Sequence, residues 1–183
     1  MNWIIPGTTL EDRRENADRI ESLFTSMFLA GGLTLSQVAA ITGLESHTIQ
    51  NWVKRGFLSP PQGKRYTKDQ VCRIITINML KGTLTLEQAC GLMSYVNGDL
   101  ADTTDDLIND AELYFMFVRL AAGARHIGGT EAWDDAMAQA LRSYREPVPG
   151  ARERVEKALR IMLNTWISNR MRQQVEDMLK ELV

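Results

Sequence analysis

The chain has 183 residues, of which 44% are hydrophobic and 24% are charged, and its formal net charge is −2. This composition is typical of a folded globular protein and argues against intrinsic disorder. The longest apolar run, residues 113–118, is far shorter than the ~20 residues that span a bilayer, so we expect no transmembrane helix.

The first residues, MNWIIPGTTLEDRREN, carry no signal-peptide pattern. They lack a basic start, a long apolar stretch and a small-residue cleavage site. We therefore expect a cytoplasmic protein with no membrane partner.

The chain has two cysteines, Cys72 and Cys90, and each lies among apolar residues at helical spacing. Neither is accompanied by the further Cys or His ligands that a zinc site requires. We expect two buried thiols, no metal site and no cofactor.

Charge is unevenly distributed along the chain. Lys and Arg against Asp and Glu count 3−5 in residues 1–42, 7−2 in 43–82, 0−1 in 83–97 and 11−15 in 98–183, which sums to −2. A segment of +5 in an otherwise acidic chain indicates an anionic partner, with phosphate the leading candidate.

The first predicted element is a helix that begins after Thr9 and ends at Gly31-Gly32. Thr9 has the residue type of a helix N-cap, and apolar residues recur behind it on one helix face. These residues are Leu10, Ala17, Ile20, Leu23, Phe24, Met27 and Phe28.

Two short helices follow. The sequence TLSQ at 34–37 opens one of them, which stops at Gly43, a residue that can adopt the left-handed conformation of a tight turn. The second runs from about Ser46 to Arg55 and offers Ile49 and Trp52 to a core. Two helices joined by one tight turn predict a helix-turn-helix.

The connector GFLSPPQGKRYT, residues 56–67, can be a linker, a phosphate-binding loop or a β-wing. Pro60 and Pro61 forbid helix and lack amide donors, so this stretch is extended or turned, with Gly63 able to lie at its tip. Helix is predicted again over 68–81, and Thr85 caps a further helix.

Small polar residues and acids at 98–104 indicate a domain boundary. Beyond it we predict helices at about 105–122, 131–144 and 150–182. The apolar segment 113–120 can be core, a dimer face or the lining of a small-molecule effector pocket.

In the last predicted helix, apolar residues recur three or four positions apart and form a stripe that requires a partner. We expect it to hold a homodimer together. The candidate dimerisation residues are Leu159, Met162, Leu163, Trp166, Ile167 and Met171.

Residues 33–94 resemble the winged helix-turn-helix domain of the MerR-type bacterial transcription regulators. The stretch TLSQVAAITGLESHTIQNW at 34–52 looks like their first two helices, and KRGFLSPP at 54–61 looks like the entry to their wing. RYT at 65–67 is similar to the end of that wing, and MLKGTLTLEQA at 79–89 to the junction that follows it. Helices before and after the domain make the chain look most like an uncharacterised MerR-like family.

The resemblance implies an all-α fold with a small β-wing, namely a MerR-like winged helix-turn-helix plus a helical second half. It divides the chain into an N-terminal helix at 1–32, the winged domain at 33–98 and a helical dimerisation or effector region at 99–183. Two departures stand out: the wing is several residues shorter than the family's, and Gln50 occupies a position that is commonly Arg.

The expected partner is double-stranded DNA. A short helix in the major groove reads base edges with amide and small polar side chains, while flanking cations hold phosphates. The helix at about 46–55 would enter the groove, and the wing at 58–66 would lie on the backbone. The candidate DNA-binding residues are Gln37, Ser46, His47, Thr48, Gln50, Asn51, Lys54, Arg55, Lys64, Arg65, Tyr66 and Lys68.

These features predict a dimeric, sequence-specific DNA-binding transcription regulator. The alternative is a protein-interaction module that uses the winged helix as a scaffold and docks through its helical second half. We expect no enzyme, because the sequence offers no arrangement of a nucleophile with a base and no set of metal ligands.

Overall fold

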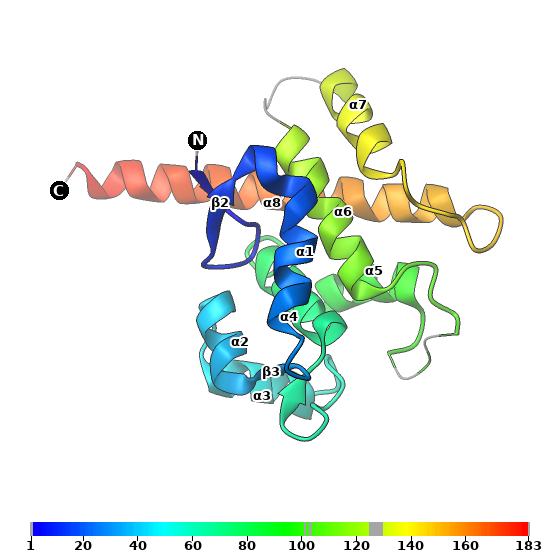
Figure 1. Ribbon diagram of the computed structural model, residues 1–183. Helices are drawn as coiled ribbons and strands as arrows, with labels where there is room; N and C mark the ends of the chain where they lie inside the picture. The colour runs from blue at the N-terminus through cyan, green and yellow to red at the C-terminus, as the bar shows by residue number, and fades with distance from the viewer. Residues whose placement is uncertain (1, 101, 103, 125–129, 183) are drawn as a thin grey trace.

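The structure is a computed structural model that describes residues 2–100, 102, 104–124 and 130–182 (Figure 1). It is mostly helical, with two small two-stranded sheets. The predicted composition of helices with a little β structure is therefore confirmed. Within the described ranges, no helix is both long enough and apolar enough to cross a membrane.

The N-terminus differs from the prediction of one helix beginning after Thr9. Strands β1 (Asn2–Ile4) and β2 (Glu11–Arg13) form an antiparallel hairpin, with Trp3 opposite Asp12. A 3-10 turn η1 (Arg14–Asn16) leads into helix α1 (Ala17–Met27), which ends before the predicted Gly31-Gly32.

Tertiary contacts explain the difference at the N-terminus. Thr9 caps no helix, because its hydroxyl donates to the carbonyl of Ala40, 2.7 Å away. Gly7 adopts a φ of +75°, and a Cβ there would lie 2.6 Å from the carbonyl oxygen of Ile75. A side chain does not fit at Gly7, so the chain turns back there against Ile75.

The helices of the central segment follow the prediction closely. They are α2 (Leu35–Thr42), α3 (Ser46–Lys54), α4 (Lys68–Leu80) and α5 (Leu86–Asn97). Strand β3 (Leu33–Thr34) precedes α2 and pairs antiparallel with β4 (Arg65–Tyr66), which precedes α4. This pairing closes the helix-turn-helix segment into a loop with both ends held together.

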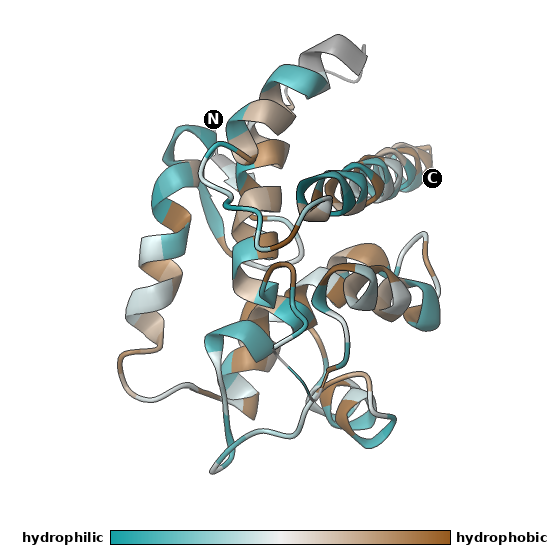
Figure 2. Ribbon diagram, turned by 90° about the vertical axis from the view of Figure 1, so that its right-hand side faces the viewer, coloured by the Kyte–Doolittle hydropathy of each residue, from teal (hydrophilic) through white to brown (hydrophobic). Residues whose placement is uncertain are grey.

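The second half consists of α6 (Asp110–Gly123), α7 (Thr130–Ala140) and the 30-residue α8 (Ala151–Lys180). All three were predicted, with boundaries shifted by a few residues. Figure 2 views α8 nearly along its axis, beside the helical body. The proposed domain boundary near 98–104 stays a prediction, and the buried apolar residues on both sides of it belong to one hydrophobic cluster.

Helix α6 lies at the centre of this cluster and packs against α1, α4, α7 and α8. Its Tyr114, Phe115 and Phe117 are buried, and Phe24 of α1 meets Phe115 edge to face. The hydroxyl of Tyr114 donates to the carbonyl of Pro6, which fastens the N-terminal hairpin to the core. Of the three roles considered for residues 113–120, the structure gives them the role of core.

Candidate nucleic-acid interface

Helices α2 and α3 are joined by a tight turn at residues 43–45. Thr34 caps α2 through a reciprocal pair of hydrogen bonds with Gln37, and Gly43 ends α2 in the left-handed conformation with a φ of +68°. Leu44 in the turn is buried and fixes the position of α3 relative to α2. Local sequence signals therefore determine this part of the geometry.

Helix α3 has one buried face and one exposed polar face. Ile49 and Trp52 are 0% and 6% exposed and anchor the helix in the core. The opposite face carries four exposed residues at positions i, i+3, i+4 and i+7, a spacing that places them on one side of the helix, and we call them the polar row. They are His47, Gln50, Asn51 and Lys54.

No other described residue forms a side-chain hydrogen bond or an ion pair with any of these four side chains. Ser46 and Thr48, at the start of the same helix, are half-buried. The exposed row therefore presents one imidazole, two amides and one ammonium group to a partner.

A two-residue hairpin lies at residues 62–65. Gln62 and Arg65 exchange backbone hydrogen bonds of 3.0 and 2.9 Å, and Gly63 and Lys64 between them have φ values of +54° and +64°. Two successive positive φ values define a type I′ turn. Lys64 is the non-glycine residue with positive φ in the described chain, and its side chain projects from the tip in an exposed position.

The base of this hairpin corrects the role predicted for Tyr66. Tyr66 pairs with Leu33 between β3 and β4 and is 3% exposed, so it belongs to the core and is not a DNA contact. Burial raises the pKa of its hydroxyl. Arg65 donates from Nη1 to the carbonyl of Gly32 at 2.8 Å, which fastens the hairpin to the turn after α1.

Three further predicted DNA contacts form interactions within the protein. Arg55 lies 2.8 Å from Glu87 of α5, and its guanidinium stacks over the ring of Phe57. Lys68 lies 3.9 Å from Glu21 of α1 and faces that helix. Gln37 uses its side-chain oxygen to accept a hydrogen bond from the backbone amide of Thr34, so it completes a helix cap.

These ion pairs reduce the basic character of residues 43–82. Three of the seven cations in this segment are paired with carboxylates from outside it, namely Arg55 with Glu87, Lys68 with Glu21 and Arg73 with Asp110. The net charge of +5 counted for residues 43–82 therefore becomes +5 − 3 = +2 when the three partner carboxylates are included. Lys54 in the polar row and Lys64 at the hairpin tip are both exposed.

The structure also corrects the predicted dimerisation set. Leu159, Met162, Leu163 and Trp166 are 0%, 1%, 0% and 8% exposed, and they pack in the chain's own hydrophobic cluster. Ile167 is half-buried, and Met171 is 48% exposed. The chain itself therefore buries four of these six side chains, so they are not available to a second copy.

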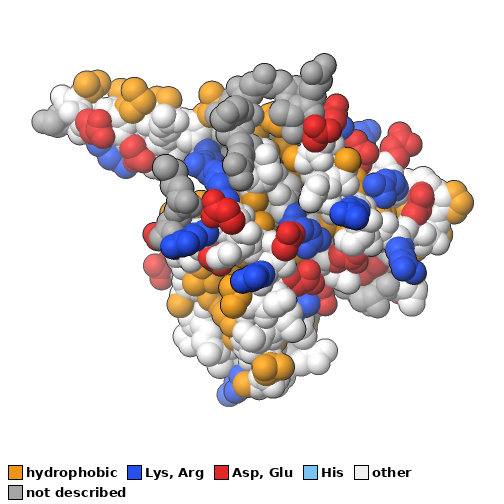
Figure 3. Space-filling view, turned by 45° about the horizontal axis from the view of Figure 1, so that its top comes forward, with side chains coloured by type: hydrophobic (Ala, Val, Ile, Leu, Met, Phe, Trp, Pro, Cys, Tyr) orange, Lys and Arg blue, Asp and Glu red, His pale blue; other side chains and the backbone are white. Residues whose placement is uncertain are grey.

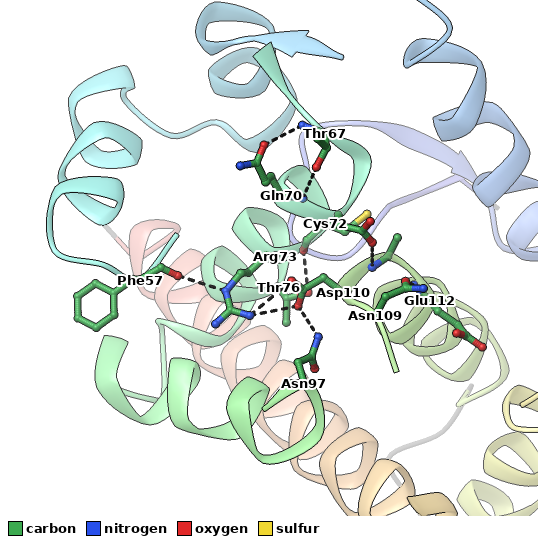
Figure 4. A network of polar contacts seen from close by, with 12 residues as sticks. Phe57, Thr67, Gln70, Cys72, Arg73, Thr76, Asn97, Asn109, Asp110 and Glu112 are labelled. Carbon is green, nitrogen blue, oxygen red and sulfur yellow. Dashed lines mark hydrogen bonds and ion pairs between the residues drawn. The ribbon is translucent and has the colours of Figure 1, made fainter. Parts of the chain in front are cut away.

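Sequence reasoning missed a buried polar network between the two halves of the chain (Figure 4). Arg73 of α4 donates from Nε to the carbonyl of Phe57 and lies 3.4 Å from Asp110 of α6. Asn97 at the end of α5 donates to the same carboxylate at 3.0 Å. The available signal was an arginine within the apolar helix 68–80, since buried arginines require a partner.

A cleft of about 630 Å³ adjoins this network, between the chain before β4, α4 and the start of α6. Asp69, Asp106 and Asp110 line it together with Arg73. Burial raises the pKa of Asp106 and that of Asp110 to about 6 in each case. Among the described residues, no group of three or more His, Cys, Asp or Glu side chains has a metal-binding arrangement.

Comparisons with known proteins match the part of the chain that contains these elements. A family model described as a domain of unknown function (DUF1836) matches residues 26–117, which contain α2, α3 and the 62–65 hairpin. The uncharacterized protein YkrK of Bacillus subtilis (strain 168) is 29% identical over 84 residues, which cover 44% of this chain and 36% of that protein. The alignment thus spans about a third of this relative's length. No solved structure matches the chain.

Proposed function

This chain belongs to the DUF1836 family, and we propose that it is a dimeric, sequence-specific DNA-binding transcription regulator. Helix α3 enters the major groove of double-stranded DNA, and the 62–65 hairpin lies on the phosphate backbone as a minimal wing. The resemblance of residues 33–94 to the winged helix-turn-helix of MerR-type regulators supports this proposal.

The observation that carries the proposal is the exposed row on α3. A short helix that is anchored by Ile49 and Trp52 presents polar side chains that have no partner within the described chain. The major groove admits one α-helix, and the base edges there offer hydrogen-bond donors and acceptors in a distinct pattern for each base pair.

The chemistry of the row divides into base reading and backbone binding. The amides of Gln50 and Asn51 can each pair with both the N6 and N7 positions of adenine. Lys54, one turn after Gln50, and Lys64 at the hairpin tip supply charges for phosphates on either side. Because the wing is short, α3 carries most of the sequence discrimination.

The test is selection of binding sites from random double-stranded DNA, followed by footprinting of the enriched sequence at moderate salt. Gln50→Ala and Asn51→Ala should each relax the preference at one position by roughly 1–3 kcal/mol. Gln139→Ala, which changes an exposed glutamine on α7, is the matched control and should leave the preference intact. If selection enriches no sequence, the proposal fails.

The alternative of a protein-interaction module is favoured by one observation. The intramolecular pairing of Arg55, Lys68 and Arg73 leaves the basic segment with a net charge of only +2. Capture of a stable protein partner, together with negligible affinity for DNA even at low salt, would support this alternative, since binding through phosphates strengthens as salt is lowered.

A further inference from the structure

The end of α8 extends beyond the body of the protein and carries apolar side chains into solvent (Figures 1 and 3). Every residue from 171 to 182 is exposed, and we call this segment the α8 overhang. Five large apolar side chains of the overhang are 48–81% exposed, and in Figure 3 hydrophobic side chains line one edge of the protruding arm. They are Met171, Val175, Met178, Leu179 and Leu182.

The side chains of the overhang leave the core because α8 runs past the body of the protein, and the apolar stripe also changes direction along the helix. An α-helix turns about 100° per residue, so a step of four residues overshoots a full turn by about 40°. Five such steps separate Val155, which is buried, from Val175, which is 56% exposed. The apolar stripe therefore shifts by about 200° around the helix between these two positions. Beyond residue 170 no face of α8 is covered, since every residue from 171 to 182 is exposed.

A groove of about 890 Å³ lies beside the overhang, between it and the N-terminal hairpin. Trp3 and Trp166, whose rings meet edge to face at 6.4 Å, line it together with Met171 and Met178. Ile4 of the hairpin lines it as well and is 58% exposed. The exposed apolar surface thus continues from the overhang onto the hairpin.

The charges of residues 168–182, which are the overhang and the three residues before it, are self-complementary. Residues 168–174 contain Arg170 and Arg172, a net charge of +2, whereas residues 175–182 contain three acids and one Lys, which gives 1 − 3 = −2. Two copies that run antiparallel place the positive part of each against the negative part of the other. A parallel pair would place like charges together, which is unfavourable.

We propose that the α8 overhang pairs antiparallel with the overhang of a second copy of this chain. The groove beside the N-terminal hairpin receives the end of the partner's overhang. Twelve residues of helix are only ~18 Å long, so the overhangs alone form a short contact. The hairpin surface around Ile4 enlarges it toward the ~1,200–2,000 Å² that stable interfaces bury.

The first test measures the oligomeric state of the full chain by sedimentation equilibrium. We expect a dimer at tens of micromolar, and a monomer when Val175→Glu and Met178→Glu are combined, with unchanged helical circular dichroism because both positions are exposed. Leu29→Glu, at an equally apolar position that is 83% exposed in the turn after α1, should remain dimeric. A monomeric wild type, or a dimer that tolerates the double substitution, would overturn the proposal.

The second test determines orientation. Arg170 and Glu181 lie on the same flank of α8, because eleven residues make about three turns. Arg170→Glu alone and Glu181→Arg alone should each weaken the dimer roughly tenfold, since each sets like charges opposite one another on both sides of the two-fold axis. An equimolar mixture of the two variants should form a heterodimer of wild-type affinity.

If Arg170→Glu leaves dimerisation unchanged, the antiparallel arrangement is wrong. Both tests are made without DNA. Their failure would therefore leave the proposed role of α3 intact, and the failure of DNA binding would not alter their outcome.

Discussion

Nη1 of Arg73 in α4 lies 3.4 Å from both carboxylate oxygens of Asp110 in α6, with side chains that are only 5% and 13% exposed. The same guanidinium donates from Nε to the carbonyl of Phe57, three residues after α3 ends. One buried arginine therefore connects the end of α3 to the first turn of the central helix of the second half.

Loss of the Arg73 cation should destabilise the protein strongly. Arg73→Met keeps an apolar stem but leaves Asp110 with Asn97 in place of its ion-pair partner and removes the donor to the carbonyl of Phe57. Because removal of one partner from a buried ion pair typically costs 3–5 kcal/mol, we expect a loss of roughly 3 kcal/mol in the free energy of unfolding. Urea denaturation at pH 7 measures it. Arg142→Met, at an exposed position, is the control, and equal losses in both variants would contradict the assigned role.

Asp110 should make stability depend on pH in a defined direction. Burial raises its pKa from 3.8 to about 6, against the opposing effect of Arg73, with Asp69 and Asp106 adding like charge. Between these values the folded protein holds a proton that the unfolded chain has lost, so this contribution to stability falls as pH rises from about 4 to about 6.

The matched variant for this pH effect is Asp110→Asn, which cannot titrate. From pH 4 to pH 6 the wild type should lose on the order of 1 kcal/mol more stability than this variant, measured by urea denaturation at each pH. A difference between the two proteins that stays constant with pH would show that Asp110 does not titrate in this range.

Lys64 should affect stability and DNA binding in opposite directions. A lysine with a φ of +64° is strained, whereas Asn and Gly tolerate this conformation. Lys64→Asn should therefore raise the free energy of unfolding by about 0.5–1 kcal/mol while it weakens binding to all DNA sequences alike. Thermal denaturation and DNA titration measure the two effects. Lys157→Asn, an exposed lysine of α8, should leave DNA affinity unchanged.

Gly32 should be required for the attachment of the 62–65 hairpin, and its neighbour Gly31 is a built-in control. Both have positive φ, at +103° and +85°, so alanine is strained at either position. A Cβ on Gly32 would also lie 2.7 Å from the backbone oxygen of Tyr66, whereas nothing lies within 4 Å of one on Gly31.

Gly31→Ala should thus cost about 1 kcal/mol, and Gly32→Ala should cost about 1–3 kcal/mol more. Only Gly32→Ala should expose Tyr66 of β4, as measured by tyrosine fluorescence quenching or amide hydrogen exchange at residues 65–66. If the two variants behave alike, the close approach at Gly32 is not a structural requirement.

The central helices could be predicted from sequence because their start signals are local. Thr34, Thr67 and Thr85 each precede a helix and have a Gln three residues later, and all three form reciprocal capping boxes. Such a cap involves only four consecutive residues, so the local sequence is enough to predict it. The turn at Gly43 is local in the same sense.

The roles of individual cations could not be predicted in this way. Arg55 and Lys68 look like phosphate contacts in the sequence, and only the fold brings Glu87 and Glu21 within reach of them. These partners are 32 and 47 residues distant, so no local pattern indicates them. Tyr66 likewise became a core residue because β4 pairs with β3, where its partner Leu33 lies 33 residues earlier.

The sequence by itself determined the helical elements between residues 34 and 97, the turn at Gly43 and the polar row on α3, because caps, glycines and helical periodicity act over a few residues. The tertiary structure decided three things: the N-terminal hairpin, the pairing of cations with distant carboxylates, and the point along α8 where the apolar stripe leaves the core. Each of these depends on which segments contact one another in the fold. A local stretch of sequence does not determine the free energy of contacts between distant residues, so it cannot predict them.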